Sequence, residues 1–244
     1  MAKKRKNANY IGSKSYKERE AKRAERESAD KRRKMTVLVS LILALITVIL
    51  IPVSIVAGVK AYRAKDNKYV EIVVKDYGSI VVYLDAYEAP ETVANFVKLA
   101  ENGFYDNLTF HRANKTIIQG GDPLGTGSGG SPDKIKGEFS ANGHRNNIEH
   151  ERGVISMARS SGTASDNYGY DTASSQFFIC VEDYPDWDGT YAAFGHVVEG
   201  MDVVDAINAG MRAKLTGSSE TISKKADQPK ILTVRVLNDY VPAN

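Results

Sequence analysis

An arginine, a glutamine and paired aromatic residues occur in two short segments of the sequence. The first is Phe110-His111-Arg112, followed seven residues later by Gln119, and the second is Ser175-Gln176-Phe177-Phe178-Ile179. Side chains alternate between the two faces of a strand, so Phe110 and Arg112 are predicted to share one face and His111 to lie on the other. That face would offer guanidinium donors beside an aromatic ring, and Gln119 adds a donor and an acceptor. These groups can hold a ligand by hydrogen bonds against an apolar wall, without a nucleophile or a metal ion.

The adjacent Phe177 and Phe178 would point to opposite faces of a strand. We expect one of them to line a pocket while the other fills the core. Each aromatic residue taken alone is explained by core packing, and Arg112 taken alone by a surface ion pair. Their occurrence together favours a binding site.

Three other kinds of site are disfavoured. Gly125–Gly130 matches the pattern G-x-G-x-x-G, but no apolar helical stripe follows it, so we expect a flexible or ligand-adjacent turn and not a nucleotide site. The four histidines show no spacing typical of metal ligands, and no serine stands in a G-x-S-x-G context. The predicted site therefore requires no cofactor and no metal.

The elements that position these residues are short strands. Alternating apolar residues predict a hairpin of strands 69–75 and 80–84 with a turn at Asp76-Tyr77-Gly78. Pro90 opens a helical pattern that ends before Gly103, and a second helix is predicted over 201–208, ending near Gly210. Further strands are predicted at 109–113, 116–119, 154–157, 177–181, 192–198 and 231–237. Eight strands with only two helices favour an antiparallel barrel or sandwich.

The N-terminal part has a different composition. Residues 1–34 hold fourteen Lys or Arg and five Asp or Glu, a net charge of +9, whereas the whole chain carries +3, so residues 35–244 carry −6. Because the basic character is confined to the tail, we expect no nucleic-acid partner. The tail is compatible with a helix lying on anionic lipid and equally with a solvated segment.

An uncharged apolar run, Met35–Val59, follows the tail. As a helix it would extend about 37 Å at about 1.5 Å per residue, enough to cross a hydrocarbon core of about 30 Å. We predict a transmembrane helix; a buried core helix and a cleavable signal peptide, which has a shorter apolar run, are the alternatives. More cations lie before the run than after it, which predicts a cytoplasmic N-terminus and an extracytoplasmic C-terminal domain in a single-pass plasma-membrane protein.

The chain has a single cysteine, Cys180, so no intramolecular disulfide can form. It lies in an apolar run and is expected to be a buried core residue. The predicted organisation is a basic cytoplasmic tail over 1–34, a transmembrane helix over 35–59, a linker over 60–68 and a folded domain over 69–244.

Seven motifs follow one another in a fixed order. They are Phe110-His111-Arg112, Gln119-Gly120-Gly121-Asp122, Gly125-Thr126-Gly127, Gly153-Val154-Ile155-Ser156-Met157-Ala158, Ser175-Gln176-Phe177-Phe178-Ile179, Asp188-Gly189 and Phe194-Gly195-His196-Val197-Val198-Glu199-Gly200-Met201. Over about residues 69–240 this order resembles the cyclophilin-type peptidyl-prolyl cis-trans isomerases, and the topology resembles that of membrane-anchored bacterial members.

The resemblance implies a mainly β fold, a closed eight-stranded antiparallel barrel with two capping helices. It implies that Arg112 is the catalytic residue and that proline-containing polypeptides are the substrates. It also implies that the protein assists the folding of extracytoplasmic proteins and needs no cofactor. We expect a monomer. The residues that match substrate-binding positions are Phe110, Gln119, Ala158, Phe178, Trp187 and Tyr191.

One segment departs from the family pattern. The stretch between Arg112 and Gln119 is one residue shorter than usual, and Thr116-Ile117 replaces a Phe-Met pair. The alternative function is therefore a cyclophilin-like module that binds peptides or acts as a chaperone with little turnover.

Overall fold

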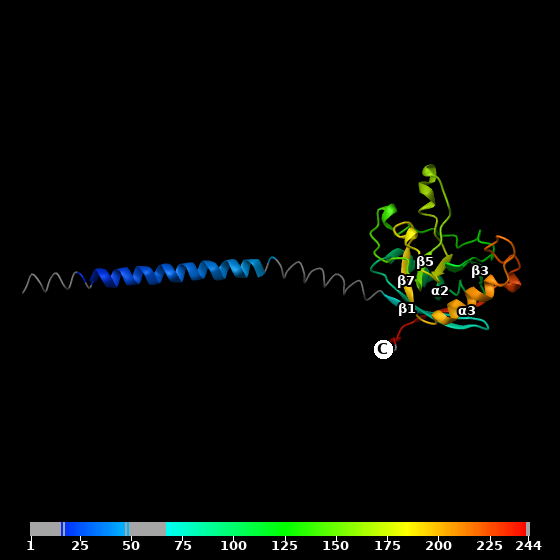
Figure 1. The fold of residues 1–244 in the computed structure, drawn as a ribbon, viewed down its shortest axis with the longest axis horizontal. Coiled ribbons are helices and arrows are strands. Elements are labelled where there is room, and N and C mark those ends of the chain that lie inside the picture. Colours follow the sequence, from blue (N-terminus) through cyan, green and yellow to red (C-terminus); the bar gives the residue numbers. More distant parts are fainter. Residues whose placement is uncertain (1–15, 17, 47, 49–66, 243–244) are drawn as a thin grey trace, which may run out of the picture. The chain divides into compact units, whose positions relative to one another are not determined.

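A computed structural model describes residues 16, 18–46, 48 and 67–242 of the 244-residue chain. The chain divides into two compact units, Met1–Val59 and Lys60–Asn244 (Figure 1).

In the first unit, residues 18–46 form a continuous helix. Its charged part is supported by ion pairs one turn apart, Arg23 with Glu27 at 3.2 Å and Lys34 with Asp30 at 2.8 Å, which stabilise a helix modestly. Among the described residues, no helix combines the length and the apolar character needed to cross a membrane. Residues 47 and 49–59 of the predicted span lie outside the described residues.

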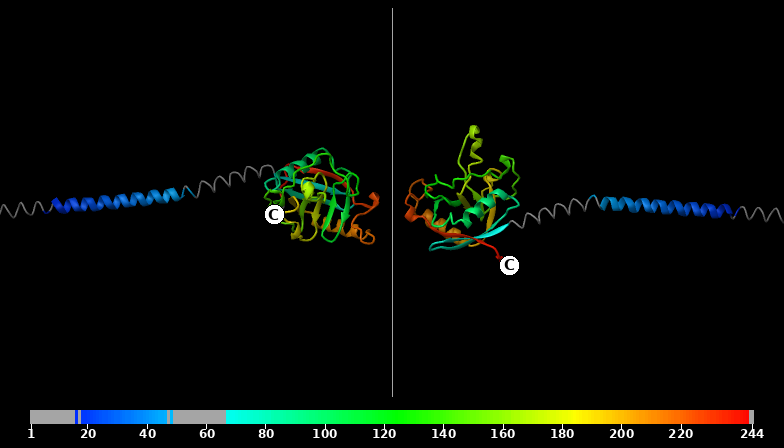
Figure 2. Two further views of the ribbon diagram at one scale, coloured as in Figure 1. Left: turned by 90° about the horizontal axis from the view of Figure 1, so that it is seen from above. Right: turned by 180° about the vertical axis from the view of Figure 1, so that it is seen from behind.

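The second unit is built on one antiparallel sheet that curls around the core (Figure 2). The strand order is β3-β4-β6-β5-β7-β2-β1-β8. The strands are β1 (Lys68–Val74), β2 (Gly78–Leu84), β3 (Phe110–Ala113), β4 (Ile117–Gly120), β5 (Val154–Met157), β6 (Phe177–Cys180), β7 (Ala193–Glu199) and β8 (Ile231–Leu237). The predicted eight antiparallel strands are thus confirmed.

A closed barrel is not shown, because no hydrogen-bonded ladder joins the two end strands β3 and β8 in the described residues. A single bridge pairs Thr109 with Lys230. Strand β3 has four residues, and the connection before β8 occupies its outer edge. The amide of Ala113 donates to the carbonyl of Glu220, and the amide of Phe110 donates to that of Pro229, both at 2.9 Å. The sheet is therefore a curled, incompletely closed barrel.

Two helices cover the sheet, as predicted. Helix α2 (Pro90–Glu101) begins with proline at its first turn and buries Val93, Phe96 and Ala100. The Phe96 ring packs on Tyr105, Phe177 and Phe194, with ring centroids 4.9, 5.5 and 5.3 Å away. Helix α3 (Met201–Arg212) buries Val204, Ile207, Asn208 and Met211.

The predicted end of α3 near Gly210 is wrong, since the helix continues to Arg212. Met211 is fully buried and holds the last turn against the core. A Cβ on Gly210 would lie 2.6 Å from the Tyr77 hydroxyl. The glycine therefore makes room for a packed tyrosine and does not stop the helix.

Candidate active site

Four side chains form a row across neighbouring strands on one face of the sheet. Arg112 on β3 lies directly opposite Gln119 on β4, and Gln119 lies opposite Phe178 on β6. Phe178 in turn lies opposite Ser156 on β5. Directly opposed residues share a face of the sheet. The strand order thus brings together an arginine and an aromatic residue that are far apart in the sequence.

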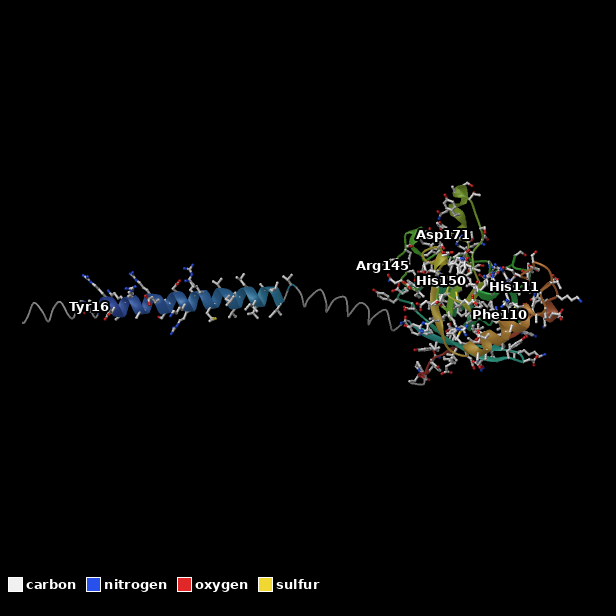
Figure 3. All side chains as sticks on the ribbon, in the orientation of Figure 1. Tyr16, Phe110, His111, Arg145, His150 and Asp171 are labelled. Carbon is white, nitrogen blue, oxygen red and sulfur yellow. The ribbon has the colours of Figure 1, made fainter. Side chains whose placement is uncertain are left out.

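The predicted alternation along Phe110-His111-Arg112 is wrong. The register between β3 and β4 shifts between Phe110 and Arg112, so the two side chains do not share a face. Phe110 is fully buried in the main core, with its ring centroid 5.9 Å from that of Phe177, and it does not line the site beside Arg112. His111 is also fully buried, and neither of its ring nitrogens has a hydrogen-bond partner in the described structure. Figure 3 shows both residues inside the domain.

The Arg112 guanidinium is fixed on two sides. Its Nε and Nη2 both donate to Oε2 of Glu220, at 2.9 and 2.6 Å, and Nη1 donates to Oε1 of Gln119 at 3.0 Å. A guanidinium has five N–H donors. Three are engaged within the described part of the chain, which leaves two for a ligand. The Arg112 side chain is 37% exposed, so a ligand can reach it.

A chain of side-chain amides continues from Arg112 into the neighbouring loop. Gln119 Nε2 donates to Oε1 of Gln176 at 2.9 Å, and Gln176 Nε2 donates to the carbonyls of Gly127 and Gly129 at 2.9 and 2.7 Å. The direction is fixed because a guanidinium only donates and a carbonyl only accepts. Gln119 thus presents one remaining N–H to a ligand.

The glycine-rich loop is held by the fully buried Asp122. Its carboxylate accepts the amides of Leu124, Thr126 and Gly127 at 2.8, 2.9 and 2.6 Å. Burial alone would raise the pKa of Asp122, but these backbone donors outweigh it and lower the pKa below its usual value. The loop lines a groove together with Gln119, and its predicted position next to a ligand stays a prediction.

Aromatic side chains form a second apolar cluster on the same face as Arg112. The Phe178 ring lies 5.1 Å from Trp187 and 5.7 Å from Tyr191, both nearly perpendicular to it. Ala158 packs against the same cluster, and Ile117 is buried within it. Phe177 is in the main core, so the two adjacent phenylalanines face opposite sides as predicted.

The shortened segment after Arg112 forms a tight, well-bonded turn. Asn114 Oδ1 accepts the amides of Thr116 and Ile117 at 2.8 and 2.9 Å. Asn208 on α3 donates to the carbonyls of Asn114 and Ile117 at 2.8 and 3.2 Å. The turn directs Ile117 into the aromatic cluster, where it supplies apolar surface.

A buried serine and histidine, together with a partly exposed aspartate, lie beneath Phe178. His150 Nδ1 is 2.8 Å from Asp188 Oδ1 and its Nε2 is 3.1 Å from Ser156 Oγ. Ser156 is fully buried, so it is inaccessible as a nucleophile. The His150 ring stacks under Phe178 at 6.0 Å. Burial lowers the pKa of His150, against the opposing effect of Asp188. The three residues are thus a support for the aromatic wall.

A groove of about 380 Å³ adjoins this face and is lined by Gln119, Ala158 and Gln176 together with the glycine-rich loop. Arg159 also lines it, with its guanidinium carbon 4.6 Å from the Tyr191 ring centroid and 5.0 Å from that of Tyr170. Tyr170 belongs to the long segment 160–174, which projects from the domain (Figure 1). Arg159 therefore joins this segment to the aromatic cluster.

The structure gathers most of the predicted site residues. Arg112, Gln119, Ala158, Phe178, Trp187 and Tyr191 lie together, whereas Phe110 does not. Three residues were not predicted: Gln176, Arg159 and Glu220. Gln176 lies within the motif Ser175–Ile179, and Arg159 directly follows Ala158, so the sequence motifs could have indicated both residues. No sequence motif indicated Glu220, because it is separated from Arg112 by 108 positions in the sequence.

Comparison with known proteins agrees with this geometry. The family model described as cyclophilin type peptidyl-prolyl cis-trans isomerase/CLD matches residues 69–236, more than half of the chain. The chain belongs to the cyclophilin family. Within the described residues, this cyclophilin has no cluster of three His, Cys, Asp or Glu that could hold a metal ion.

Relatives of this cyclophilin are isomerases. It is 38% identical over 159 residues to a peptidyl-prolyl cis-trans isomerase of Helicobacter pylori, covering 62% of this chain and 90% of that protein. It is 45% identical over 123 residues to peptidyl-prolyl cis-trans isomerase B of Bacillus subtilis, covering 50% and 78%. A crystal structure of a cyclophilin type isomerase from Cryptosporidium parvum, in the presence of the dipeptide Ala-Pro, matches with a TM-score of 0.58 and 27% identity over 70% of this chain and 100% of that one. The protein is therefore a peptidyl-prolyl cis-trans isomerase.

Proposed function

We propose that this cyclophilin binds proline-containing polypeptides across the Arg112 face and that Arg112 stabilises the twisted X-Pro amide. The observation that carries this proposal is the row Arg112, Gln119 and Phe178 on three neighbouring strands. Two guanidinium N–H groups have no partner in the described residues, and they lie on the same face of the sheet as the aromatic cluster, which supports the proposal. The proline ring packs on Phe178, and Gln119 holds a substrate carbonyl.

The chemistry needs no covalent step. Rotation about a peptide bond crosses a barrier of about 18–20 kcal/mol because resonance must be broken. In the twisted amide the nitrogen regains a lone pair, which can accept a hydrogen bond that the planar amide cannot. A donor fixed at that position binds the transition state better than either ground state, which lowers the barrier. The hydrogen bonds that Arg112 donates to Glu220 and Gln119 hold its guanidinium in a fixed position.

The structural relative crystallised in the presence of Ala-Pro supports the substrate class. A dipeptide of this kind has a proline ring for the aromatic cluster and one amide for Arg112. The groove beside Gln119 and Ala158 is available for the residues that flank the proline.

The test is an isomerisation assay on a proline-containing peptide with the full chain. Arg112→Ala is expected to lower kcat/KM about 100-fold or more, as is typical when one fixed transition-state donor is removed. Arg145→Ala is the control, since Arg145 is exposed and bonds only to Asn147 in the described residues. Equal rates for Arg112→Ala and the unmodified chain would refute the catalytic role of Arg112.

The second candidate is peptide binding or chaperone action with little turnover. The ion pair with Glu220 favours it, because the carboxylate neutralises part of the Arg112 charge. The same assay separates the two functions. Tight binding of the peptide with no acceleration of its isomerisation would select the binding module.

We further propose that the isomerase is anchored in the plasma membrane through residues 35–59 and assists the folding of extracytoplasmic proteins. The uncharged apolar run and the fourteen cations before it support this proposal. Protease added to intact cells is expected to remove the C-terminal domain. Full protection of that domain, with digestion after lysis as the control, would contradict the proposed orientation.

A further inference from the structure

Glu220 is the acidic partner of Arg112 in the described structure. One of its oxygens accepts two N–H groups of Arg112, and the other accepts Nδ2 of Asn114 at 3.2 Å. Both carboxylate oxygens are thus engaged, one with the arginine and one with the turn that follows β3. The Glu220 carboxylate thus connects the Arg112 guanidinium to Asn114, the residue that follows the last residue of β3.

The backbone fixes Glu220 at this position. The amide of Ala113 donates to the Glu220 carbonyl, and the amide of Ile222 donates to the His111 carbonyl, both at 2.9 Å. Arg112 pairs with Thr221 in an antiparallel bridge. Ile222 is buried in the main core and anchors the segment there. Residues 220–222 therefore form a short edge partner for β3, which sets the register of Glu220 against Arg112.

The bonding pattern leaves Arg112 with little freedom. Nε and Nη2 bonding to one oxygen fix the edge of the guanidinium plane, and Gln119 fixes Nη1 from the other side. A free arginine side chain has many rotamers, and it loses conformational freedom when it is ordered. Because Glu220 orders the Arg112 side chain before a ligand binds, binding does not have to restrict its rotamers.

The ion pair contributes little to folding. Both side chains are more than a third exposed, at 37% and 43%, and exposed ion pairs add little to stability. Burial alone would raise the pKa of Glu220, but Arg112 and Asn114 outweigh it and lower the pKa, so the carboxylate is charged at neutral pH. The effect of Glu220 should therefore appear in the reaction and not in the stability of the domain.

We propose that Glu220 is a positioning residue for the isomerase reaction, which holds the Arg112 guanidinium in the orientation that meets the twisted amide. This inference rests on the proposed function of Arg112. Glu220 acts through Arg112 and does not contact the reacting atoms.

The test combines kinetics with a double-mutant cycle on the full chain. Glu220→Ala is expected to lower kcat about ten-fold with a smaller change in KM, because small losses of orientation cost factors of this size. Glu220→Gln keeps an acceptor oxygen and should lie between Glu220→Ala and the unmodified chain. In the Arg112→Ala background, Glu220→Ala should change kcat no further. Glu101→Ala, an exposed glutamate at the end of α2, is the matched control.

A spectroscopic readout separates positioning from a general structural effect. The NMR signal of the Arg112 Nε–H should shift in Glu220→Ala and Glu220→Gln and stay in place in Glu101→Ala. An equal loss of kcat from Glu220→Ala in both backgrounds, or no loss at all, would overturn the inference. If Arg112→Ala itself leaves the rate unchanged, the proposed function fails instead, whatever the Glu220 variants do.

Discussion

Arg112 on β3 and Phe178 on β6 lie two strands apart on one face of the sheet, each directly opposite Gln119. Neighbouring strands are about 4.8 Å apart, so their backbones are separated by roughly 10 Å. Gln119 lies between the two residues in this row. In the proposed function, the proline ring lies on the aromatic side of Gln119 and the amide nitrogen on the arginine side.

The first prediction concerns the shape of the cation. Arg112→Lys keeps the charge but cannot bond to Glu220 and Gln119 at once in the planar arrangement of a guanidinium. We expect kcat/KM to fall by about 10–100-fold, between the unmodified chain and Arg112→Ala. Peptide isomerisation kinetics measure this, with circular dichroism to show that the fold is retained. Full activity of Arg112→Lys would mean that charge alone is sufficient.

The second prediction uses two adjacent residues on opposite faces. Phe177→Leu and Phe178→Leu should each lower the free energy of unfolding by about 1–2 kcal/mol, because both rings are buried. Only Phe178→Leu should also raise KM for a proline peptide, since Phe178 belongs to the aromatic cluster and Phe177 to the main core. Chemical denaturation and steady-state kinetics measure the two effects. A matching rise of KM in both variants would contradict the assignment of faces.

The third prediction concerns stability in acid. Burial lowers the pKa of His111 below its usual 6.5, against the opposing effect of Asp122. The unfolded chain therefore takes up a proton that the folded chain does not, and stability is lost as the pH falls below about 6.5. The slope is at most about 1.4 kcal/mol per pH unit for each such histidine.

His111→Leu tests this directly. Neither ring nitrogen has a partner in the described structure, so an apolar side chain of similar size forfeits no hydrogen bond there. We expect unchanged or higher stability at neutral pH and a flatter dependence on pH, measured by urea unfolding from about pH 7.5 to about pH 5. His196→Gln, at an exposed position on β7, is the control. A pH dependence identical to that of the unmodified chain would exclude His111 as its source.

The fourth prediction concerns the single cysteine. Cys180 is fully buried, and burial, with smaller effects of Asp183 and Asp188, raises its pKa to about 12. The reactive thiolate is therefore scarce at neutral pH. Alkylation followed by mass spectrometry should label Cys180 only in denaturant. Rapid labelling of the folded protein would show that this part of β6 opens readily.

Much of the fold was predictable from local patterns. The apolar alternation located all eight strands, and Pro90 marked the start of α2, because these signals act within a few residues. The end of α3 was missed because Gly210 meets Tyr77, which lies far away in the sequence. Closure of the barrel depended on how the connection before β8 meets β3, which no local pattern encodes.

The site was predictable where motifs were contiguous. Phe177 and Phe178 were assigned to opposite faces from their adjacency alone. Phe110 was misplaced because a register shift next to His111 breaks the alternation, and such a shift depends on the partner strand. The role of Glu220 also could not be predicted from local sequence, because its contact with Arg112 depends on the pairing of residues 220–222 with β3.

One peptide bond separates Phe177, in the interior, from Phe178, at the site. Deleting or inserting a single residue just before this pair would exchange their roles, because every side chain of β6 would change face. In the described structure, one strand thus contributes both to the main core and to the proposed substrate face. We therefore expect related enzymes to have no insertions or deletions in β6, and to differ in the length of the projecting segment 160–174.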